Sequence, residues 1–211
     1  MYCRYVKRII DIIISVIALP VFFLLFIIFG LLIKLEDGGP IFYKAERIGK
    51  DGKLFKMYKF RSMRVNAPIL LNPDGSTYNS DNDPRVTRIG KFIRETSIDE
   101  IPQILNVFKG DMSIIGPRAS LASALNTYKD DEIDKMKVRP GITGYTQAYY
   151  RNRLSNREKR LKDAWYANNV NLWLDIKIFF KTIITVIKRE GIYTDTEIEK
   201  KSIQKENMGV K

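Results

Sequence analysis

The sequence predicts an α+β protein in which a membrane-inserted helix precedes one small domain of short helices and short strands. An uncharged apolar block runs from Ile12 to Ile33. After it, short apolar stretches alternate with turn residues, without an internal repeat. The length of 211 residues allows one ordinary domain plus an appendage. We expect a re-entrant membrane segment at 1–35, a cytosolic, membrane-associated domain at 36–193 and a mobile tail at 194–211.

The apolar block is long enough to cross a bilayer. Its 22 residues would rise about 33 Å as a straight helix, against a hydrocarbon core of about 30 Å. A cleaved signal peptide is disfavoured because the run is long and no small-residue cleavage site follows it. Two interpretations stay open, a single-pass anchor and a re-entrant helix-hairpin that enters and leaves by the same face.

Pro20 and the flanking charges favour the re-entrant form. A proline inside a helix removes a backbone hydrogen bond and bends or breaks the helix. Lysine and arginine residues lie on both flanks of the block, and such residues prefer the cytoplasmic side of a membrane. A segment that bends at Pro20 and returns to the same side satisfies both flanks. Asp11 is expected at the interface or paired with Lys7 or Arg8.

The remaining elements follow from periodicity and turn residues. In chain order they are strands at 41–49 and 52–60, a long surface loop at 66–84, helices at 87–95 and 102–110, a strand at 112–115, a surface helix at 121–137, a turn-rich extended segment at 139–150 and an apolar helix at 173–189. The last helix carries Lys177, Lys181 and Lys188 on one face. That pattern is typical of a helix lying in a membrane interface and equally of a core helix with one solvated stripe.

Composition limits the chemistry. The chain has no histidine and one cysteine, which excludes Ser-His and Cys-His nucleophile pairs, His-based zinc sites and an internal disulfide. The formal net charge of +12 indicates an anionic partner, which is nucleic acid, anionic lipid or a phosphorylated substrate.

TSIDEIPQI, residues 96–104, places Asp99 and Glu100 side by side at the start of an expected helix. Ser97 and Glu100 fit a capping box, so a purely structural role is one interpretation. Carboxylates at a helix N-terminus are also expected to stay ionised and to suit Mg²⁺. An aspartate can attack phosphorus and form an acyl phosphate. The candidate cations for a phosphate substrate are Lys59, Arg61, Arg94, Arg118 and Arg139.

Six segments carry a further signal as a set, in order from about Arg4 to Gly191: KRIIDIIIS, GGPIFYKAERIG, YKFRSMR, GKFIRETSIDEIPQILNVFKGDMSIIGPR, VRPGITG with Gln147, and LDIKIFFKTI. As a set they resemble the small monotopic phosphoglycosyl transferases, which start bacterial glycan assembly on polyprenyl phosphate. The resemblance implies a re-entrant membrane helix and an active site on the cytoplasmic face of the bacterial plasma (inner) membrane.

The same resemblance implies a reaction. A phospho-sugar would pass from a UDP-sugar to polyprenyl (undecaprenyl) phosphate with release of UMP, as the first membrane step toward a capsule, exopolysaccharide, O-antigen or glycoprotein. Asp99 would attack the β-phosphate and hold the phospho-sugar covalently, and Glu100 would help to bind Mg²⁺ or handle a proton. Arg94 and Arg118 fall on family arginines near the phosphates. Such a displacement depends mostly on positioning and charge neutralisation, so it needs no histidine.

Three departures from the family pattern bear on the site. Leu19 stands before the helix-breaking proline where relatives often have serine, and Ala119 follows Gly-Pro-Arg where relatives often have proline. After Gln147 the chain reads AYYRN, where relatives often have a small Asn-Gly pair. This segment is expected to face the sugar or nucleotide through Gln147, Tyr149 and Arg151, and the identity of the sugar stays open.

Two other functions stay open at this stage. One is a non-enzymatic membrane tether whose basic face binds anionic lipid or nucleic acid. The other is a glycosyltransferase that moves the sugar alone and releases UDP. The favoured interpretation has a UDP-sugar donor, a polyprenyl phosphate acceptor and membrane lipid as partners, Mg²⁺ as cofactor and no nucleic acid, with a homo-oligomer left open.

Overall fold

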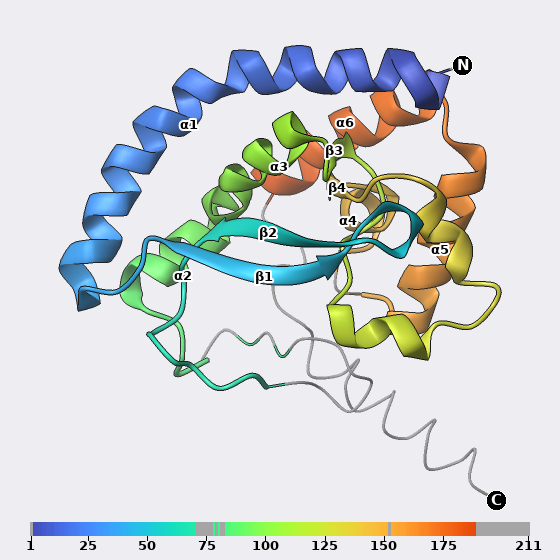
Figure 1. The fold of residues 1–211 in the computed structure, drawn as a ribbon. Helices are drawn as coiled ribbons and strands as arrows, with labels where there is room; N and C mark the ends of the chain where they lie inside the picture. Colours follow the sequence, from blue (N-terminus) through green and yellow to red (C-terminus); the bar gives the residue numbers. More distant parts are fainter. Residues whose placement is uncertain (1, 71–77, 79, 81–82, 152, 189–211) are drawn as a thin grey trace, which may run out of the picture.

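A computed structural model of the chain describes residues 2–70, 78, 80, 83–151 and 153–188. Over these residues one long helix arches across a body of short helices and two-stranded sheets (Figure 1). This mixture confirms the predicted α+β class. The tail predicted at 194–211 lies outside the described residues. The loop predicted at 66–84 lies partly outside them, and its described residues form no helix or strand.

The long helix α1 runs from Lys7 to Asp37, after a π-helical turn at Tyr2–Val6. The chain stays helical through Pro20, and the axis of α1 bends in its middle part (Figure 1), as a proline inside a helix predicts. Within the described ranges, α1 is the one helix long and apolar enough to cross a membrane. The long apolar N-terminal helix is thus confirmed, and the re-entrant hairpin stays a prediction.

The remaining elements are listed here in chain order: β1 (Phe42–Ile48), a 3-10 turn (Lys50–Gly52), β2 (Leu54–Phe60), α2 (Arg88–Glu95), a 3-10 turn (Ile98–Gln103), α3 (Ile104–Lys109), β3 (Ser113–Ile115), two 3-10 turns (Ala122–Thr127 and Ile133–Lys137), β4 (Gly141–Thr143), α4 (Tyr145–Tyr149), α5 (Asn156–Asn169) and α6 (Leu172–Ile187). β1 and β2 form an antiparallel hairpin, and β3 pairs in parallel with β4. The structure confirms the hairpin, the helices predicted at 87–95 and 102–110, the strand at 112–115 and, over its described residues, the helix at 173–189. Gly110 ends α3 in the left-handed region at φ 97°, as a C-terminal glycine should.

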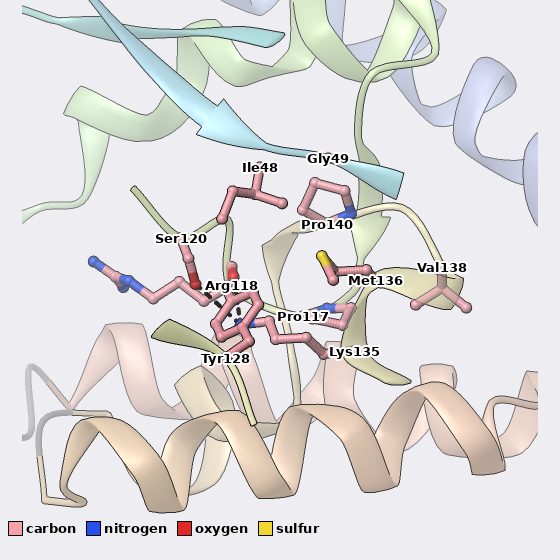
Figure 2. A pocket seen from close by; sticks show the side chains of 10 residues that line it. All are labelled: Ile48, Gly49, Pro117, Arg118, Ser120, Tyr128, Lys135, Met136, Val138 and Pro140. Carbon is pink, nitrogen blue, oxygen red and sulfur yellow. Dashed lines mark hydrogen bonds between the residues drawn. The ribbon is translucent and has the colours of Figure 1, made fainter. Parts of the chain in front are cut away.

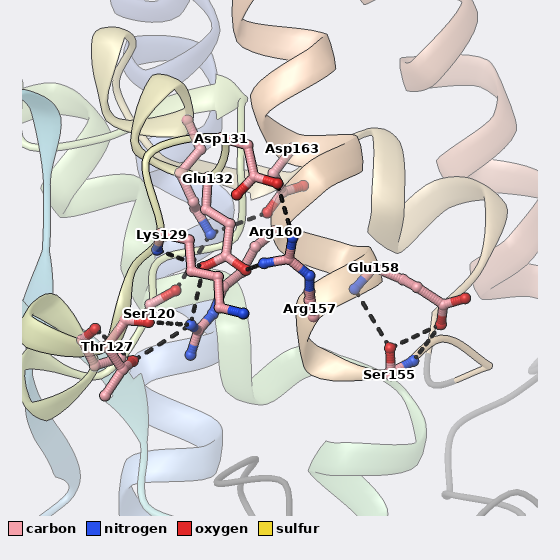
Figure 3. Close-up of polar contacts among 12 residues, drawn as sticks. Ser120, Thr127, Lys129, Asp131, Glu132, Ser155, Arg157, Glu158, Arg160 and Asp163 are labelled. Atoms are coloured by element: carbon pink, nitrogen blue, oxygen red, sulfur yellow. Dashed lines mark hydrogen bonds and ion pairs between the residues drawn. The ribbon is translucent and has the colours of Figure 1, made fainter. Parts of the chain in front are cut away.

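The prediction of one surface helix at 121–137 is wrong. Tyr128 is extended, with ψ 137°, and separates two 3-10 turns. Glu132 is buried and accepts hydrogen bonds from Arg157 and Arg160 of α5 (Figure 3), and the Lys135 side chain is buried as well. These tertiary ion pairs draw charged side chains inward, so the segment does not present the solvated stripe of a surface helix.

The segment 139–150, predicted to be turn-rich and extended, contains both β4 and α4. Sequence reasoning did not predict α5. That helix begins with a capping box in which the Ser155 hydroxyl accepts a hydrogen bond from the Glu158 amide, and the Glu158 carboxylate accepts one from the Ser155 amide (Figure 3). Two orphan amides at the helix start are satisfied in this way.

Polar contacts tie the N-terminal end of α1 to the body. Lys7 pairs with the carboxylate of Asp175 on α6. The Asp11 carboxylate accepts hydrogen bonds from the Ser113 hydroxyl at 3.0 Å and from the Ile114 amide at 2.9 Å. Asp11 therefore binds the edge of β3, and the predicted pairing with Lys7 or Arg8 is not what the structure shows.

The C-terminal end of α1 is tied to the body in the same manner. The Asp37 carboxylate accepts hydrogen bonds from the Arg61 guanidinium, and the Glu36 carboxylate accepts one from the Arg88 amide at 2.7 Å. Between the two ends, the inner face of α1 forms part of the core. The buried core side chains around it are Phe22, Phe29, Ile33, Phe60, Ile93 and Ile104.

The outer face of α1 and one face of α6 expose apolar side chains. On α1, Ile17 is 71 % exposed and Leu35 is 75 % exposed. On α6, Trp173 and Ile187 are exposed, while Asp175, Ile178 and Thr185 are buried. A core helix with one solvated stripe would bury most of its apolar side chains, so α6 fits the interfacial interpretation better.

Candidate active site

Asp99 and Glu100 lie in the 3-10 turn that joins α2 to α3. Ser97 enters this turn in the left-handed region at φ 58°, and its side chain caps no amide. The capping box predicted from Ser97 and Glu100 therefore does not form. Both carboxylates instead approach Lys59 of β2, so the structure does not support a helix-capping role for this acid pair.

Lys59, on β2, lies between the two carboxylates. Its Nζ is 2.6 Å from Glu100 Oε1 and 3.6 Å from Asp99 Oδ2. The side chains are largely buried, with exposed fractions of 19 % for Lys59, 12 % for Asp99 and 26 % for Glu100. One ammonium thus offsets part of the repulsion between two neighbouring acids, which allows both to point into the same small space.

The two carboxyl groups are tuned in opposite directions. Burial raises the pKa of Asp99 and the charge of Glu100 raises it further, against the lowering effect of Lys59 and Arg94. Burial also acts to raise the pKa of Glu100, but the charges of Lys59 and Arg118 outweigh burial and hold that pKa below its ordinary value. The helix-terminus argument predicted a lowered pKa for both acids, and this direction is found for Glu100 and reversed for Asp99. Opposed pKa shifts in one pair are typical of acids with different roles.

The charges of three arginines act on the acid pair. The positive charge of Arg94, on α2, acts on Asp99, and the charges of Arg118 and Arg151 act on Glu100. Nη1 of Arg94 is buried and has no hydrogen-bond partner among the described residues. The structure therefore brings three of the predicted arginines to the acid pair. Buried donors without partners suit an anionic ligand with many acceptor oxygens.

The backbone around Arg118 sets the direction of its side chain. It follows β3 after Gly116 and Pro117, and a Cβ atom at position 116 would lie 2.3 Å from the Arg139 carbonyl oxygen, so only glycine fits there. Beside this turn lies a small pocket lined by ten residues, and the guanidinium of Arg118 points away from it (Figure 2). The backbone of Arg118 therefore faces the pocket while its charge is free to face the acid pair.

Four side chains, which we call the Asp163 cluster, hold that backbone. Asp163 Oδ2 accepts hydrogen bonds from the Arg118 amide at 3.2 Å and from Lys135 Nζ at 3.1 Å. Asp163 Oδ1 accepts one from the Thr146 hydroxyl at 2.8 Å. Lys135 also donates to the Arg118 carbonyl at 3.1 Å and to the Ser120 hydroxyl at 3.2 Å. The cluster comprises Lys135, Thr146, Asp163 and Ser120, and none of these was a candidate from sequence because none stands in a recognised motif.

Arg61 makes its contacts at the end of α1 and not at the acid pair. The Arg61 guanidinium is 7 % exposed and donates to Asp37 and to the carbonyl oxygens of Pro40 and Met63. These donors are used inside the fold, so the structure does not support the predicted phosphate-binding role of Arg61. Nε of Arg139 donates to the Gly110 carbonyl at 2.7 Å, at the end of α3, and the predicted phosphate-binding role of Arg139 stays a prediction.

The segment after β4 supplies polar and aromatic groups. Gln147, on α4, donates to the Ile142 carbonyl at 3.0 Å, and its Oε1 is buried without a partner among the described residues. Tyr149 is 39 % exposed and its ring lies 5.0 Å from that of Tyr145 and 6.5 Å from that of Tyr150. The exposed ring of Tyr149 is a surface that suits a sugar or a base, and the predicted roles of Gln147 and Tyr149 stay predictions.

The donor set of the acid pair fits Mg²⁺. No group of three or more acidic or thiol side chains gathers within the described part of the chain. Mg²⁺ is commonly held by one or two carboxylates, with water and substrate phosphate oxygens completing its six ligands. Asp99 and Glu100 offer that arrangement, with Glu100 the more readily ionised of the two.

Comparisons with known proteins identify the family of this chain. A family model described as "Bacterial sugar transferase" matches residues 2–189. The chain is 40 % identical over 201 residues to "Undecaprenyl-phosphate galactose phosphotransferase" of Salmonella typhimurium, which covers 90 % of this chain and 42 % of that protein. It is 42 % identical over 194 residues to "UDP-N-acetylgalactosamine-undecaprenyl-phosphate N-acetylgalactosaminephosphotransferase" of Aeromonas hydrophila, which covers 89 % and 45 %.

A relative of similar length is also found. The chain is 38 % identical over 198 residues to "Exopolysaccharide production protein ExoY" of Rhizobium meliloti, which covers 89 % of this chain and 88 % of that protein. The chain thus spans less than half the length of the Salmonella and Aeromonas relatives and most of the length of the Rhizobium one. Since the family model matches nearly all of it, the chain belongs to the bacterial sugar transferase family.

Proposed function

We propose that this chain is a phosphoglycosyl transferase that moves a phospho-sugar from a UDP-sugar to polyprenyl (undecaprenyl) phosphate and releases UMP. The observation that carries the proposal is the buried acid pair bridged by Lys59 and approached by Arg94 and Arg118. The names of the Salmonella and Aeromonas relatives, which describe phosphotransferases of undecaprenyl phosphate, support it. The name of the Rhizobium relative supports a role in exopolysaccharide assembly.

The reaction proceeds in two displacements at one phosphorus atom. A carboxylate oxygen of Asp99 bonds to the β-phosphorus of the donor, and the bond from that phosphorus to the bridging oxygen breaks. UMP leaves with the bridging oxygen and its electron pair. A phosphate oxygen of the lipid acceptor then bonds to the same phosphorus and the aspartyl oxygen–phosphorus bond breaks, which yields polyprenyl diphospho-sugar and restores Asp99 as a carboxylate.

The opposed pKa shifts suit this division of labour. Asp99, whose pKa is raised, is the more basic carboxylate and thus the better nucleophile once ionised. Glu100, whose pKa is lowered, keeps its charge and is the better oxygen donor to Mg²⁺. When bound, Mg²⁺ would neutralise phosphate charge at the reacting centre. Lys59 and the arginines stabilise the charge on the phosphate oxygens.

The proposed location is the cytoplasmic face of the bacterial inner membrane. The exposed apolar faces of α1 and α6 would lie in the lipid, and a re-entrant α1, bent at Pro20, would leave its cationic flanks on the cytoplasmic side. The lipid phosphate of the acceptor is found at that boundary, so the acid pair would meet its acceptor there.

Release of UMP by purified, detergent-solubilised protein tests the function. The assay supplies a panel of UDP-sugars, polyprenyl phosphate and Mg²⁺. We expect UMP with at least one donor, and we expect Asp99→Asn to abolish it. Asp134→Asn, at an exposed aspartate, is the matched control and should keep wild-type activity.

Other products would identify other functions. UDP in place of UMP would identify a transferase that moves the sugar alone. No nucleotide product with any donor, together with binding to anionic vesicles, would favour the membrane tether. Intact-mass measurement of protein mixed with donor alone tests the covalent step, because a phospho-sugar adduct should accumulate on wild type and be missing from Asp99→Asn.

A further inference from the structure

Arg47, which sequence reasoning did not identify as a site residue, lies on the same face of the β1–β2 hairpin as Lys59. Tyr43 lies directly opposite Lys59 in the register, and Arg47 follows Tyr43 by four positions along β1. Opposite residues share a face, and residues an even number of positions apart on one strand share it too. The hairpin therefore presents Lys59 and Arg47 on one side, at two points along its length.

The end of β1 brings Arg47 to Arg118. Arg47 forms an isolated antiparallel bridge with Leu121, and the Ile48 amide donates to the Ser120 carbonyl at 3.0 Å. Figure 2 shows Ile48 and Ser120 beside Arg118 around one pocket, with the Arg118 guanidinium directed outward. Arg47 and Arg118 thus come from different segments, which backbone hydrogen bonds between β1 and residues 120–121 hold side by side.

Within the described part of the chain neither guanidinium forms a salt bridge, although the charge of Glu100 acts on both. Nε of Arg47 is buried without a hydrogen-bond partner. Burial, and next the charge of Arg118, lower the pKa of Arg47 to about 10. Two like charges held together in a half-buried place cost free energy unless an anion joins them.

Lys59 contacts both acids, with its Nζ 2.6 Å from Glu100 Oε1 and 3.6 Å from Asp99 Oδ2. The charge of Arg94 acts on Asp99, and the charges of Arg118 and Arg151 act on Glu100. Arg47 in turn interacts with Glu100 and with Arg118. In an in-line displacement the nucleophile and the leaving group lie on opposite sides of the phosphorus. A leaving phosphate therefore needs cations on the side away from Asp99.

We propose that Arg47 and Arg118 together bind the phosphate of the donor that leaves with the nucleoside. This inference rests on the proposed function and adds a binding residue for the nucleotide to it. Two guanidinium forks can each donate two parallel hydrogen bonds to phosphate oxygens, so the pair binds the phosphate of UMP as donor moiety and as product alike.

Product inhibition tests the inference. UMP is added as an inhibitor against the UDP-sugar for wild type, Arg47→Met, Arg47→Lys and the control Lys44→Met. Lys44 is exposed and lies on the other face of the same strand. We expect Arg47→Met to raise the UMP inhibition constant and the donor KM by about tenfold or more, with the KM for polyprenyl phosphate unchanged. Arg47→Lys, which keeps the charge and loses the fork, should lie between Arg47→Met and wild type.

The outcomes separate this inference from the proposed function. If wild type releases UMP while Arg47→Met and Arg47→Lys both keep the wild-type inhibition constant, the inference is overturned and the function stands. If Arg47→Met raises the KM for polyprenyl phosphate as much as the donor KM, Arg47 does not select the leaving phosphate and the inference is overturned as well. If wild type releases no UMP, both are overturned. Should Arg47→Met not fold, the Arg47→Lys constant decides, because a value equal to that of wild type contradicts the bidentate contact.

Discussion

The Asp163 cluster gives a prediction whose magnitude follows from the structure. Its central carboxylate is 1 % exposed, and the side chain of Lys135, its cationic partner among the described residues, is 7 % exposed. Lys135→Met would leave the Asp163 carboxylate buried with neutral donors only. Breaking a buried ion pair from one side costs about 3–5 kcal/mol, because the remaining charge stays desolvated. For a domain of this size that corresponds to a loss of about 6–20 °C in Tm.

Thermal unfolding of the detergent-solubilised protein measures the effect, with circular dichroism or tryptophan fluorescence as the signal. The variants are Lys135→Met, Asp163→Asn and the double variant that carries both. Removing both charges leaves no buried ion, so the double variant should lose less than the sum of the single losses by at least about 1 kcal/mol. Lys137→Met is the control, since Lys137 forms an exposed pair with Asp134, and its Tm should stay close to that of wild type.

The cluster should also affect catalysis, because it holds the backbone of Arg118 on both sides. At a temperature where the double variant is fully folded, we expect its kcat for UMP release to fall while its fold is retained. Strictly additive Tm losses, or a Lys135→Met protein as stable as the Lys137→Met control, would refute the reasoning that Lys135 and Asp163 form a buried, coupled pair.

Three further predictions follow from the site and the membrane helix. In the proposed mechanism Asp99 must be ionised to attack, and Lys59 lowers the pKa of Asp99. Activity should therefore be lost as pH falls through that pKa, and Lys59→Met should move this loss to higher pH while Lys59→Arg does not. Identical pH profiles of kcat for wild type and Lys59→Met would contradict this prediction. The second prediction concerns the topology of α1 in sealed vesicles, after replacement of Cys3. Single cysteines on the two flanks of α1 should react with an impermeant reagent from the same side, and Pro20→Ala should shift part of the population to labelling from opposite sides. Opposite-side labelling of the otherwise unchanged chain would rule out the re-entrant helix. Ser155→Ala removes the cap of α5 and should cost about 0.5–2 kcal/mol, read as a modest fall in Tm without change in the donor KM.

Local signals in the sequence predicted most of the elements. The hairpin was predictable because the alternation of apolar and polar residues and the turn between the strands are properties of neighbouring residues. Gly110 marks the end of α3 because glycine readily adopts the left-handed conformation found there. The segment 121–137 was not predictable in the same way, because Glu132 and Lys135 are turned inward by partners far along the chain. The helical periodicity of a segment carries no information about contacts with residues far along the chain.

The candidate site was likewise predictable only in part. Adjacent acids at 99 and 100 stand out in the sequence, and Lys59, Arg94 and Arg118 were candidates beside them. Arg61 stands two positions after Lys59, yet it binds the end of α1 because β2 has already ended at Phe60. Arg47 was missed because its relation to Lys59 appears only once the strand register is known.

The anchoring of α1 at both ends has a consequence for how the protein works with a lipid. Lys7 and Asp11 fasten one end of α1 to the body, and Asp37 and Glu36 fasten the other. On the proposed function, the apolar helix and the acid pair are therefore held in a fixed relation, because both ends of α1 are bound to the body that carries Asp99. The height of the chemistry above the acyl chains is then a property of the fold itself. Exchange of this helix for an unrelated hydrophobic anchor would keep the protein on the bilayer and still lose the alignment with the lipid phosphate.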